Sequence, residues 1–113
     1  MNRGAAAEAL AANFLAARGL TILQRNYRCR GGEIDLIARD GTTLVFVEVR
    51  LRRNRRFGTA GESITAAKRR RLRFAALHYL ARLGREPRCR FDAVLLDALA
   101  GDNVEWLRDV EGI

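Results

Sequence analysis

Three acidic side chains lie close together in an otherwise apolar stretch of the sequence. Residues 31–50 read GGEIDLIARDGTTLVFVEVR, and the acids in the two apolar runs are Glu33, Asp35 and Glu48. Carboxylates gathered on an apolar surface repel one another unless a cation or a basic side chain lies between them. Carboxylate oxygens are the ligands that Mg²⁺ and Mn²⁺ prefer in proteins. The pattern therefore predicts a metal site, provided that these side chains share one face.

The same stretch predicts a β-hairpin that would bring the acids together. Asp40 and Gly41 separate the two apolar runs, and Asp-Gly in that setting is a strong hairpin signal. With these two as the turn residues, Asp35 stands opposite Phe46. Asp35 and Glu48 then lie diagonally on one face of the hairpin, about 7–8 Å apart at their Cα atoms. The prediction of a metal site depends on this register.

Two helical side chains are further candidates for the same site. Glu8 lies off the predicted apolar stripe of the first helix, so its spacing alone favours a solvated acid in the first helical turn. The other interpretation is an additional acid that reaches the hairpin. Lys68 falls on the apolar stripe of the second helix, where it needs an acidic or phosphate partner unless its long stem carries the charge to solvent. Spacing does not decide between these two interpretations of Lys68.

Hydrophobic periodicity and turn residues predict the elements that carry these side chains. The first helix is expected to bury Ala7, Leu10, Phe14 and Ala17. The predicted elements are a helix over 5–18, a strand over 20–28, the two hairpin strands within 31–50, a helix over about 63–83, and strands over 90–96 and 103–110. Asp92, in the strand over 90–96, is a further acid that could belong to the site. The order α-β-β-β-α-β-β predicts an α/β fold with a mixed central β-sheet flanked by helices.

The chain has a strong excess of positive charge. Its formal net charge is +8 and its pI is about 11.1, values that favour a nucleic-acid partner. Lys68 is the only lysine, and genome base composition can explain arginine in place of lysine but not the excess of basic over acidic residues. The candidates for phosphate contact are Arg28 and Arg30 before the hairpin, Arg52, Arg53, Arg55 and Arg56 after it, and Arg69 and Arg70 on the second helix.

Length, cysteines and hydropathy limit the class of protein. A chain of 113 residues with 49% apolar residues predicts one folded domain over residues 1–113. Cys29, Cys89 and the single histidine, His78, cannot assemble a zinc-ligand set. No apolar run approaches the roughly 20 residues needed to span a bilayer, and the N-terminus lacks the pattern of a leader peptide. We therefore expect a reduced, cytoplasmic protein that does not use a membrane.

Taken together, these motifs resemble a known family. The blocks GEIDL and FVEV at hairpin spacing, followed by FG at 57–58 and RFD at 90–92, look like the YraN-like family of small bacterial proteins. That family is similar in core architecture to the restriction-endonuclease-like nucleases, which include archaeal Holliday-junction resolvases. The resemblance covers nearly the whole chain and implies a restriction-endonuclease-like core.

The resemblance also implies roles for individual residues. Asp35 matches the acid of the nuclease motif, and Glu48 matches the acid of its E-x-K element. Glu8 matches a helix acid that many resolvase-like members use, and the backbone carbonyl of Val49 would be a further metal ligand. Arg50 stands where the nuclease pattern expects lysine. Arginine stays charged and cannot act as a base, although it can orient an anion and stabilise phosphoryl charge.

The activity that follows from this resemblance is phosphodiester hydrolysis dependent on Mg²⁺ or Mn²⁺. Asp35, Glu48 and Glu8 would hold the ion, while Arg50 and Lys68 would stabilise the transition state, with Lys68 in the role of the missing lysine. We expect DNA rather than RNA as substrate, in a structured or branched form. Resolvase-like relatives often act as dimers, so the resemblance allows a homodimer. The alternative is a catalytically inactive nucleic-acid-binding module of the same fold.

Overall fold

The fold is a five-stranded mixed sheet with two helices, in the predicted order α-β-β-β-α-β-β. The computed structural model describes residues 3–51, 65–97 and 103–110. The elements are α1 (Arg3–Ala17), β1 (Thr21–Cys29), β2 (Gly32–Asp40), β3 (Thr43–Leu51), α2 (Ala66–Leu83), β4 (Cys89–Leu96) and β5 (Val104–Leu107). The strands lie in the order β1-β2-β3-β4-β5, and only β3 and β4 pair in parallel. The predicted fold class is therefore confirmed.

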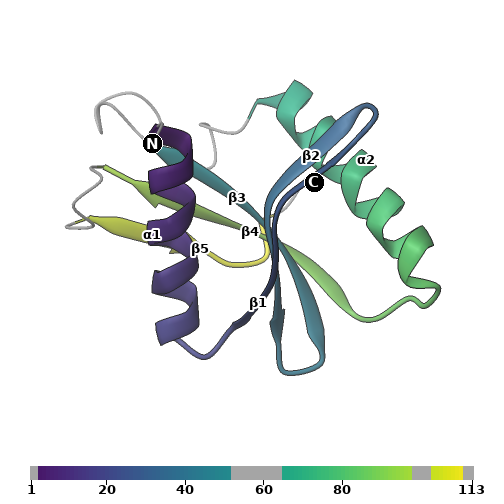
Figure 1. The fold of residues 1–113 in the computed structure, drawn as a ribbon, viewed down its shortest axis with the longest axis horizontal. Helices are drawn as coiled ribbons and strands as arrows, with labels where there is room; N and C mark the ends of the chain where they lie inside the picture. Colours follow the sequence, from purple (N-terminus) through teal and green to yellow (C-terminus); the bar gives the residue numbers. More distant parts are fainter. Residues whose placement is uncertain (1–2, 52–64, 98–102, 111–113) are drawn as a thin grey trace.

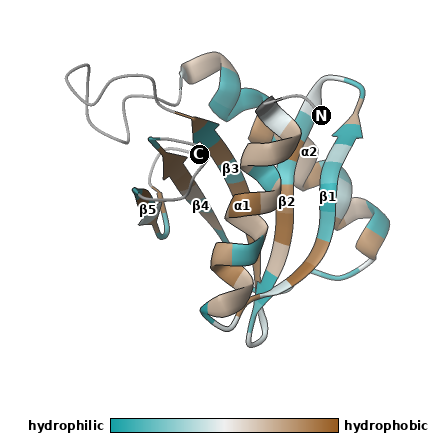
Figure 2. Ribbon diagram, turned by 60° about the vertical axis from the view of Figure 1, so that its left-hand side comes forward, coloured by the Kyte–Doolittle hydropathy of each residue, from teal (hydrophilic) through white to brown (hydrophobic). Residues whose placement is uncertain are grey.

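The two helices cover opposite faces of the sheet (Figure 1). One apolar cluster joins α1 residues such as Ala11 and Leu15 to Val45 and Val47 of β3. The other joins Leu72 of α2 and its neighbours to residues of β1, β2 and β3. Neighbouring residues of β3 thus enter different clusters, because successive side chains of a strand point to opposite faces. The ribbon accordingly has the colour of hydrophobic residues along much of β2, β3 and β4 (Figure 2).

The hairpin forms as predicted, but its register differs from the prediction. Asp40 pairs with Thr43, so the loop residues are Gly41 and Thr42 instead of Asp40 and Gly41. Gly41 has φ +61°, a conformation that glycine adopts without the steric cost of a Cβ atom. The ladder continues to a pair between Leu36 and Val47. One step further along the same register, Asp35 is level with Glu48, and the predicted pairing of Asp35 with Phe46 was wrong.

The buried face of α1 also differs from the predicted one. Ala7, Ala11 and Leu15 are buried, whereas Ala17, predicted to be buried, is exposed. Leu10 and Phe14 only pack at the margin of the cluster. An alanine-rich helix has small apolar residues on several sides, so its sequence contains little contrast between faces. The buried stripe in the structure follows residues 7, 11, 12 and 15, and the half-buried Glu8 lies beside its N-terminal end.

α2 approaches the β1–β2 hairpin closely at a single glycine. Thr65 caps the N-terminus of α2 by accepting a hydrogen bond from the Lys68 N–H, and Gly84 ends the helix with φ +75°. A Cβ atom on Gly32 would lie 2.5 Å from the Arg71 carbonyl oxygen and 2.8 Å from the Ala75 nitrogen. Only glycine allows this contact between β2 and the backbone of α2, and the contact brings α2 close to β2 at Arg71 and Ala75.

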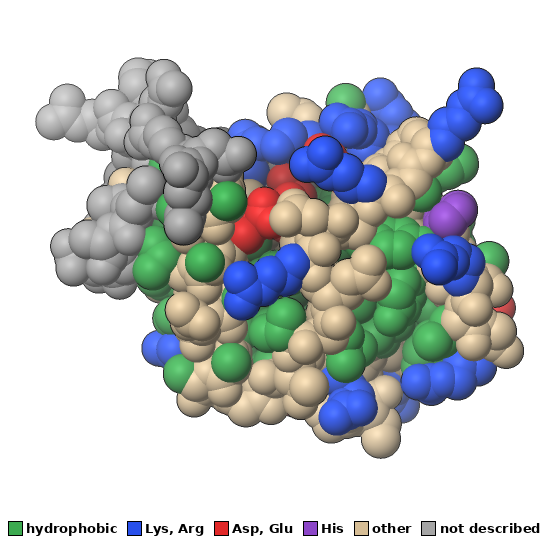
Figure 3. Space-filling view, viewed as in Figure 1, with side chains coloured by type: hydrophobic (Ala, Val, Ile, Leu, Met, Phe, Trp, Pro, Cys, Tyr) green, Lys and Arg blue, Asp and Glu red, His purple; other side chains and the backbone are tan. Residues whose placement is uncertain are grey.

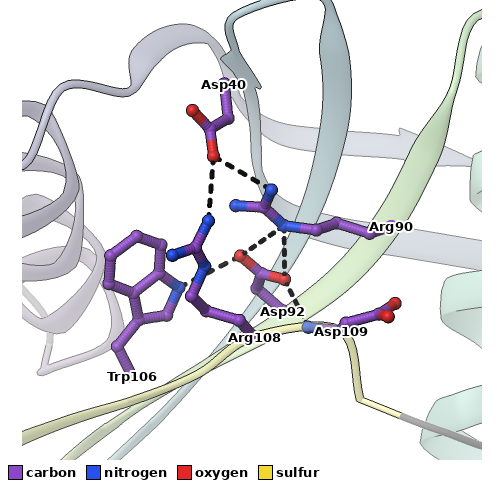
Figure 4. A network of polar contacts seen from close by, with 6 residues as sticks. All are labelled: Asp40, Arg90, Asp92, Trp106, Arg108 and Asp109. Carbon is purple, nitrogen blue, oxygen red and sulfur yellow. Dashed lines mark hydrogen bonds and ion pairs between the residues drawn. The ribbon is translucent and has the colours of Figure 1, made fainter.

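Asp92 belongs to a separate polar network that holds the C-terminal segment against β4 (Figure 4). Its carboxylate is 1% exposed and accepts hydrogen bonds from Arg90 Nε, Trp106 Nε1 and the Asp109 N–H. Arg90 also contacts Asp40 at 2.9 Å. Every oxygen of Asp92 is therefore engaged in fixing the fold, and Asp92 does not line the cavity described below.

Candidate functional site

One cavity collects acidic side chains from three different elements. It has a volume of about 330 Å³ and lies between α1, the hairpin and the first turn of α2. Glu8, Asp35, Glu48, Val49 and Lys68 all line it. The remaining described lining residues are Gly4, Ala7, Glu33 and Leu51. All candidate metal ligands predicted from the sequence therefore meet in one place.

Asp35 and Glu48 form the centre of this cavity. The Val49 N–H donates a hydrogen bond to Asp35 Oδ2 at 2.8 Å, which ties the β2 acid to β3 just beyond Glu48. The two carboxyl groups also hydrogen-bond each other. Burial, followed by the charge of Asp35, raises the pKa of Glu48 from 4.5 to about 7. Burial likewise raises the pKa of Asp35. A cation beside these two carboxylates would offset the cost of their burial and of their mutual repulsion.

Lys68 supplies positive charge directly to this pair. Its Nζ atom lies 3.4 Å from Glu48 Oε1, and the two side chains are 38% and 7% exposed. The lysine thus points inward, and of its two sequence interpretations the one with an acidic partner is confirmed. Lys68 lowers the pKa of both Asp35 and Glu48, but in each case burial outweighs that effect. One lysine therefore does not compensate the acids of this cavity.

Glu8 lies in the cavity, although its spacing alone had favoured a solvated acid. It lies beyond the first turn of α1, on the same face as the buried Ala11 and Leu15. Burial raises the pKa of Glu8, and the charge of Asp35 adds to that rise. Its Oε1 atom is buried and has no hydrogen-bond partner among the described residues. An unpaired buried oxygen costs about 1–3 kcal/mol, so this atom needs a hydrogen-bond donor, a water or a ligand beyond the described residues.

Glu33 is a fourth acid of the cavity, and it is paired with arginines. Arg71 Nη2 lies 3.4 Å from its Oε1 atom, and Arg28 Nε lies 4.0 Å from its Oε2 atom. Arg71 was not among the candidates predicted from the sequence, and only its proximity to the hairpin in space identifies it. Glu33 also raises the pKa of Asp35. The two arginines place guanidinium groups from β1 and α2 at the rim of the acidic cavity.

The other predicted basic residues lie at different positions. Arg50 is half-buried on β3 but is not among the described residues that line the cavity. Arg30 and Arg70 are exposed, and Arg69 is half-buried. Lys and Arg side chains border a group of acidic side chains on one face of the molecule (Figure 3). The four arginines at positions 52, 53, 55 and 56 lie outside the described residues.

The donor set of the cavity fits a hard divalent cation such as Mg²⁺ or Mn²⁺. All its acidic groups are carboxylates, three of them have a raised pKa, and Glu8 presents an unpaired buried oxygen. Within residues 3–51, 65–97 and 103–110, no three His, Cys, Asp or Glu side chains are already gathered closely enough to hold a metal ion. A cation would therefore have to draw the acids away from their present donors and closer to one another.

Comparison with known proteins gives consistent matches along the chain. The model of a family described as "Uncharacterised protein family UPF0102" matches residues 7–96. A UPF0102 protein of Nitrosospira multiformis is 60% identical over 95% of this chain and 90% of its own length. A UPF0102 protein of Symbiobacterium thermophilum is 63% identical over 80% of this chain and 78% of its own length. In the described part of the chain, no helix is both long and apolar enough to cross a membrane.

Proposed function

This chain belongs to the UPF0102 (YraN-like) family, and for this member we propose the function that its acidic cavity supports best: metal-dependent endonuclease activity on nucleic acid. The reaction would be hydrolysis of phosphodiester bonds, with structured or branched DNA as the expected substrate in preference to RNA. Membership confirms the resemblance inferred from the residues.

One observation supports this proposal above all. Carboxylates from α1, β2 and β3 line the same cavity as the only lysine of the chain. Their pKa values are raised by burial and by neighbouring acids, and the positive charges nearby do not cancel that rise. A protein core gains nothing from such an arrangement, because buried charge without a partner destabilises the folded state. A site for a cation and a phosphate explains it.

The residues would divide the work as follows. Asp35, Glu48 and Glu8, with the backbone carbonyl of Val49, would hold Mg²⁺ or Mn²⁺. When bound, the ion lowers the pKa of a coordinated water and offsets charge on the scissile phosphate. Lys68 contacts Glu48 from the partly exposed side of the cavity, so its ammonium group can reach a phosphate oxygen that enters from solvent. It would stabilise the charge that develops on that oxygen in the transition state.

The basic surface supports a polyanionic substrate. Arg28, Arg30, Arg69 and Arg70 would contact the phosphate backbone beside the cavity, as would the arginines at 52, 53, 55 and 56. No base-reading element is evident within residues 3–51, 65–97 and 103–110, so recognition by backbone and shape is expected. A homodimer on branched DNA is part of this proposal, as is a cytoplasmic location, with which the free thiols of Cys29 and Cys89 agree.

The second candidate function is a non-catalytic nucleic-acid-binding module. Arg50 favours it, because a guanidinium group stands where the nuclease pattern has lysine and cannot donate a proton to the leaving group. Arg50 also does not line the cavity. The position of Lys68 beside Glu48 opposes this candidate. It places a lysine next to the acids, although this lysine comes from α2 and not from β3.

The deciding experiment compares the wild-type protein with Asp35→Asn and Glu48→Gln. Each is incubated with linear, branched and single-stranded DNA and with RNA, in Mg²⁺, in Mn²⁺ and in chelator. Glu86→Gln is the matched control, because it removes an exposed carboxylate that does not line the cavity. Cleavage that requires the ion, persists in the control and is lost in both cavity variants supports the nuclease. Salt-sensitive binding without cleavage of any substrate supports the binding module.

A further inference from the structure

Asn26 makes a contact with Glu8 that the proposed function does not yet include. The Asn26 side chain hydrogen-bonds Glu8 and lowers its pKa, so the amide N–H is the donor and the carboxylate is the acceptor. Glu8 Oε1 has no partner among the described residues. The amide therefore contacts Oε2 and leaves Oε1 available to a ligand.

Asn26 reaches Glu8 from outside the metal cavity. A second hollow, of about 350 Å³, is lined by Gly4, Ala5, Glu8, Asn26 and Arg28. Glu8 lines both hollows, whereas Asn26 lines only this second one. Glu8 therefore lies between the two hollows, of which the first is also lined by Asp35 and the second by Asn26.

The backbone at Asn26 has an unusual conformation for a strand. Its φ is +54°, a left-handed conformation that is rare within a strand and that asparagine tolerates better than most residues. The pairs on either side of it, Arg25 with Leu36 and Tyr27 with Ile34, keep one register. Asn26 is therefore level with Asp35, so the residue with the left-handed backbone lies on β1 directly beside the acid of β2.

We propose that Asn26 is a positioning residue that orients the Glu8 carboxylate as a metal ligand. The inference rests on the proposed function, because it assumes that Glu8 ligates the ion. A ligating carboxylate whose other oxygen is fixed by a hydrogen bond binds its ion more tightly, and loss of such an outer partner commonly lowers metal affinity 10–100-fold. Asn26 is exposed, so we expect an effect of about tenfold, at the lower end of that range.

Two substitutions separate the amide from the backbone conformation. Asn26→Gly removes the donor and keeps the left-handed φ without strain. Asn26→Asp keeps the size and shape of the side chain, and aspartate also tolerates the left-handed φ, but the substitution places a second carboxylate against Glu8. Asp109→Gly is the matched control, because Asp109 has the same φ of +54° and does not line either hollow.

The measurement is calorimetric titration of each protein with Mn²⁺, together with thermal unfolding. We expect Asn26→Gly to bind Mn²⁺ about tenfold more weakly with little change in Tm, Asn26→Asp to bind more weakly still, and Asp109→Gly to bind like the wild type. In DNA cleavage, Asn26→Gly should need about tenfold more metal for half-maximal rate yet reach nearly the wild-type rate at saturation. A role limited to the shape of the strand would leave the metal dependence of the glycine variant unchanged.

Failure of this inference differs from failure of the proposed function. Wild-type affinity in both Asn26 variants, with the wild type itself binding Mn²⁺, overturns the positioning role and leaves the nuclease proposal standing. A wild-type protein that binds no Mn²⁺ overturns both. If Asn26→Gly does not fold, Asn26→Asp decides alone, because undiminished affinity in that variant is incompatible with a required amide donor.

Discussion

Lys68 Nζ lies 3.4 Å from Oε1 of Glu48, joining the first turn of α2 to the third strand. The only lysine of the chain thus forms an ion pair with a glutamate twenty positions earlier in the sequence. The glutamate side chain is 7% exposed and the lysine side chain is 38% exposed, so the lysine is the partner that solvent or a substrate can reach.

We predict that Lys68→Ala lowers the rate of metal-dependent cleavage at least tenfold while DNA affinity falls less than threefold. The substitution removes a charge that acts on the transition state, and such losses reduce kcat more than binding. Arg85→Ala is the control, since Arg85 is an exposed arginine beyond the end of α2 and its loss changes the net charge equally. Full activity in Lys68→Ala would remove Lys68 from the mechanism.

Stability of the metal-free protein should fall as pH rises from about 4.5 to about 7. The pKa of Glu48 rises from 4.5 in its ordinary state to about 7 in the folded protein, so the folded state holds a proton that the unfolded chain releases. This contribution is complete below pH 4.5 and is lost as pH passes through 7. One pKa unit corresponds to about 1.4 kcal/mol, so the loss amounts to roughly 3 kcal/mol shared by the Asp35–Glu48 pair.

Denaturant unfolding at pH 5 and pH 8 measures this effect. In Glu48→Gln the difference between the two pH values should shrink by most of that amount, because the amide does not titrate. Glu86→Gln, which removes an exposed acid, should behave like the wild type. An equal pH dependence in the wild type and Glu48→Gln would mean that Glu48 ionises normally in the folded protein.

Gly32→Ala should destabilise the protein by about 1–3 kcal/mol, the usual cost of overpacking. Its Cβ atom would lie 2.5 Å from a backbone oxygen of α2, so the helix must move away from the hairpin. Cleavage should fall as well, since the same helix carries Lys68. Gly41→Ala offers a comparison: it strains a positive φ but meets no atom within 4 Å, so it should cost less and leave cleavage intact. Thermal unfolding and cleavage assays of both variants test this order.

Asp92→Ala should destabilise the fold by about 3–5 kcal/mol, the range expected when one partner of a buried ion pair is removed. It leaves Arg90, Trp106 and the Asp109 N–H without their common acceptor. Asp40→Ala removes a more exposed partner of Arg90 and should cost about 1 kcal/mol or less. Both variants should keep wild-type affinity for Mn²⁺ when folded, because neither residue lines the cavity. A loss of Mn²⁺ binding in folded Asp92→Ala would connect this network to the site.

Local sequence signals predicted most of the fold. The helices, the hairpin, Gly84 at the end of α2 and the order of the elements follow from periodicity and turn residues, which act over a few neighbouring positions. The candidate acids were identifiable for the same reason, since Asp35 and Glu48 stand out as acids in apolar strands. Their membership of neighbouring strands does not depend on the exact register, so both line one cavity although the predicted pairing was wrong.

Only the tertiary structure decided which side chains meet. The hairpin loop lies one residue later than predicted, because Asp40 pairs with Thr43. Glu8 of the alanine-rich α1 lines the cavity. Lys68 also lines it, whereas Arg50 does not. The contacts of Asn26 with Glu8 and of Arg71 with Glu33 join residues far apart in the chain. Such contacts depend on how helices and strands pack against one another, and packing is a property of the whole chain that no short window of sequence contains.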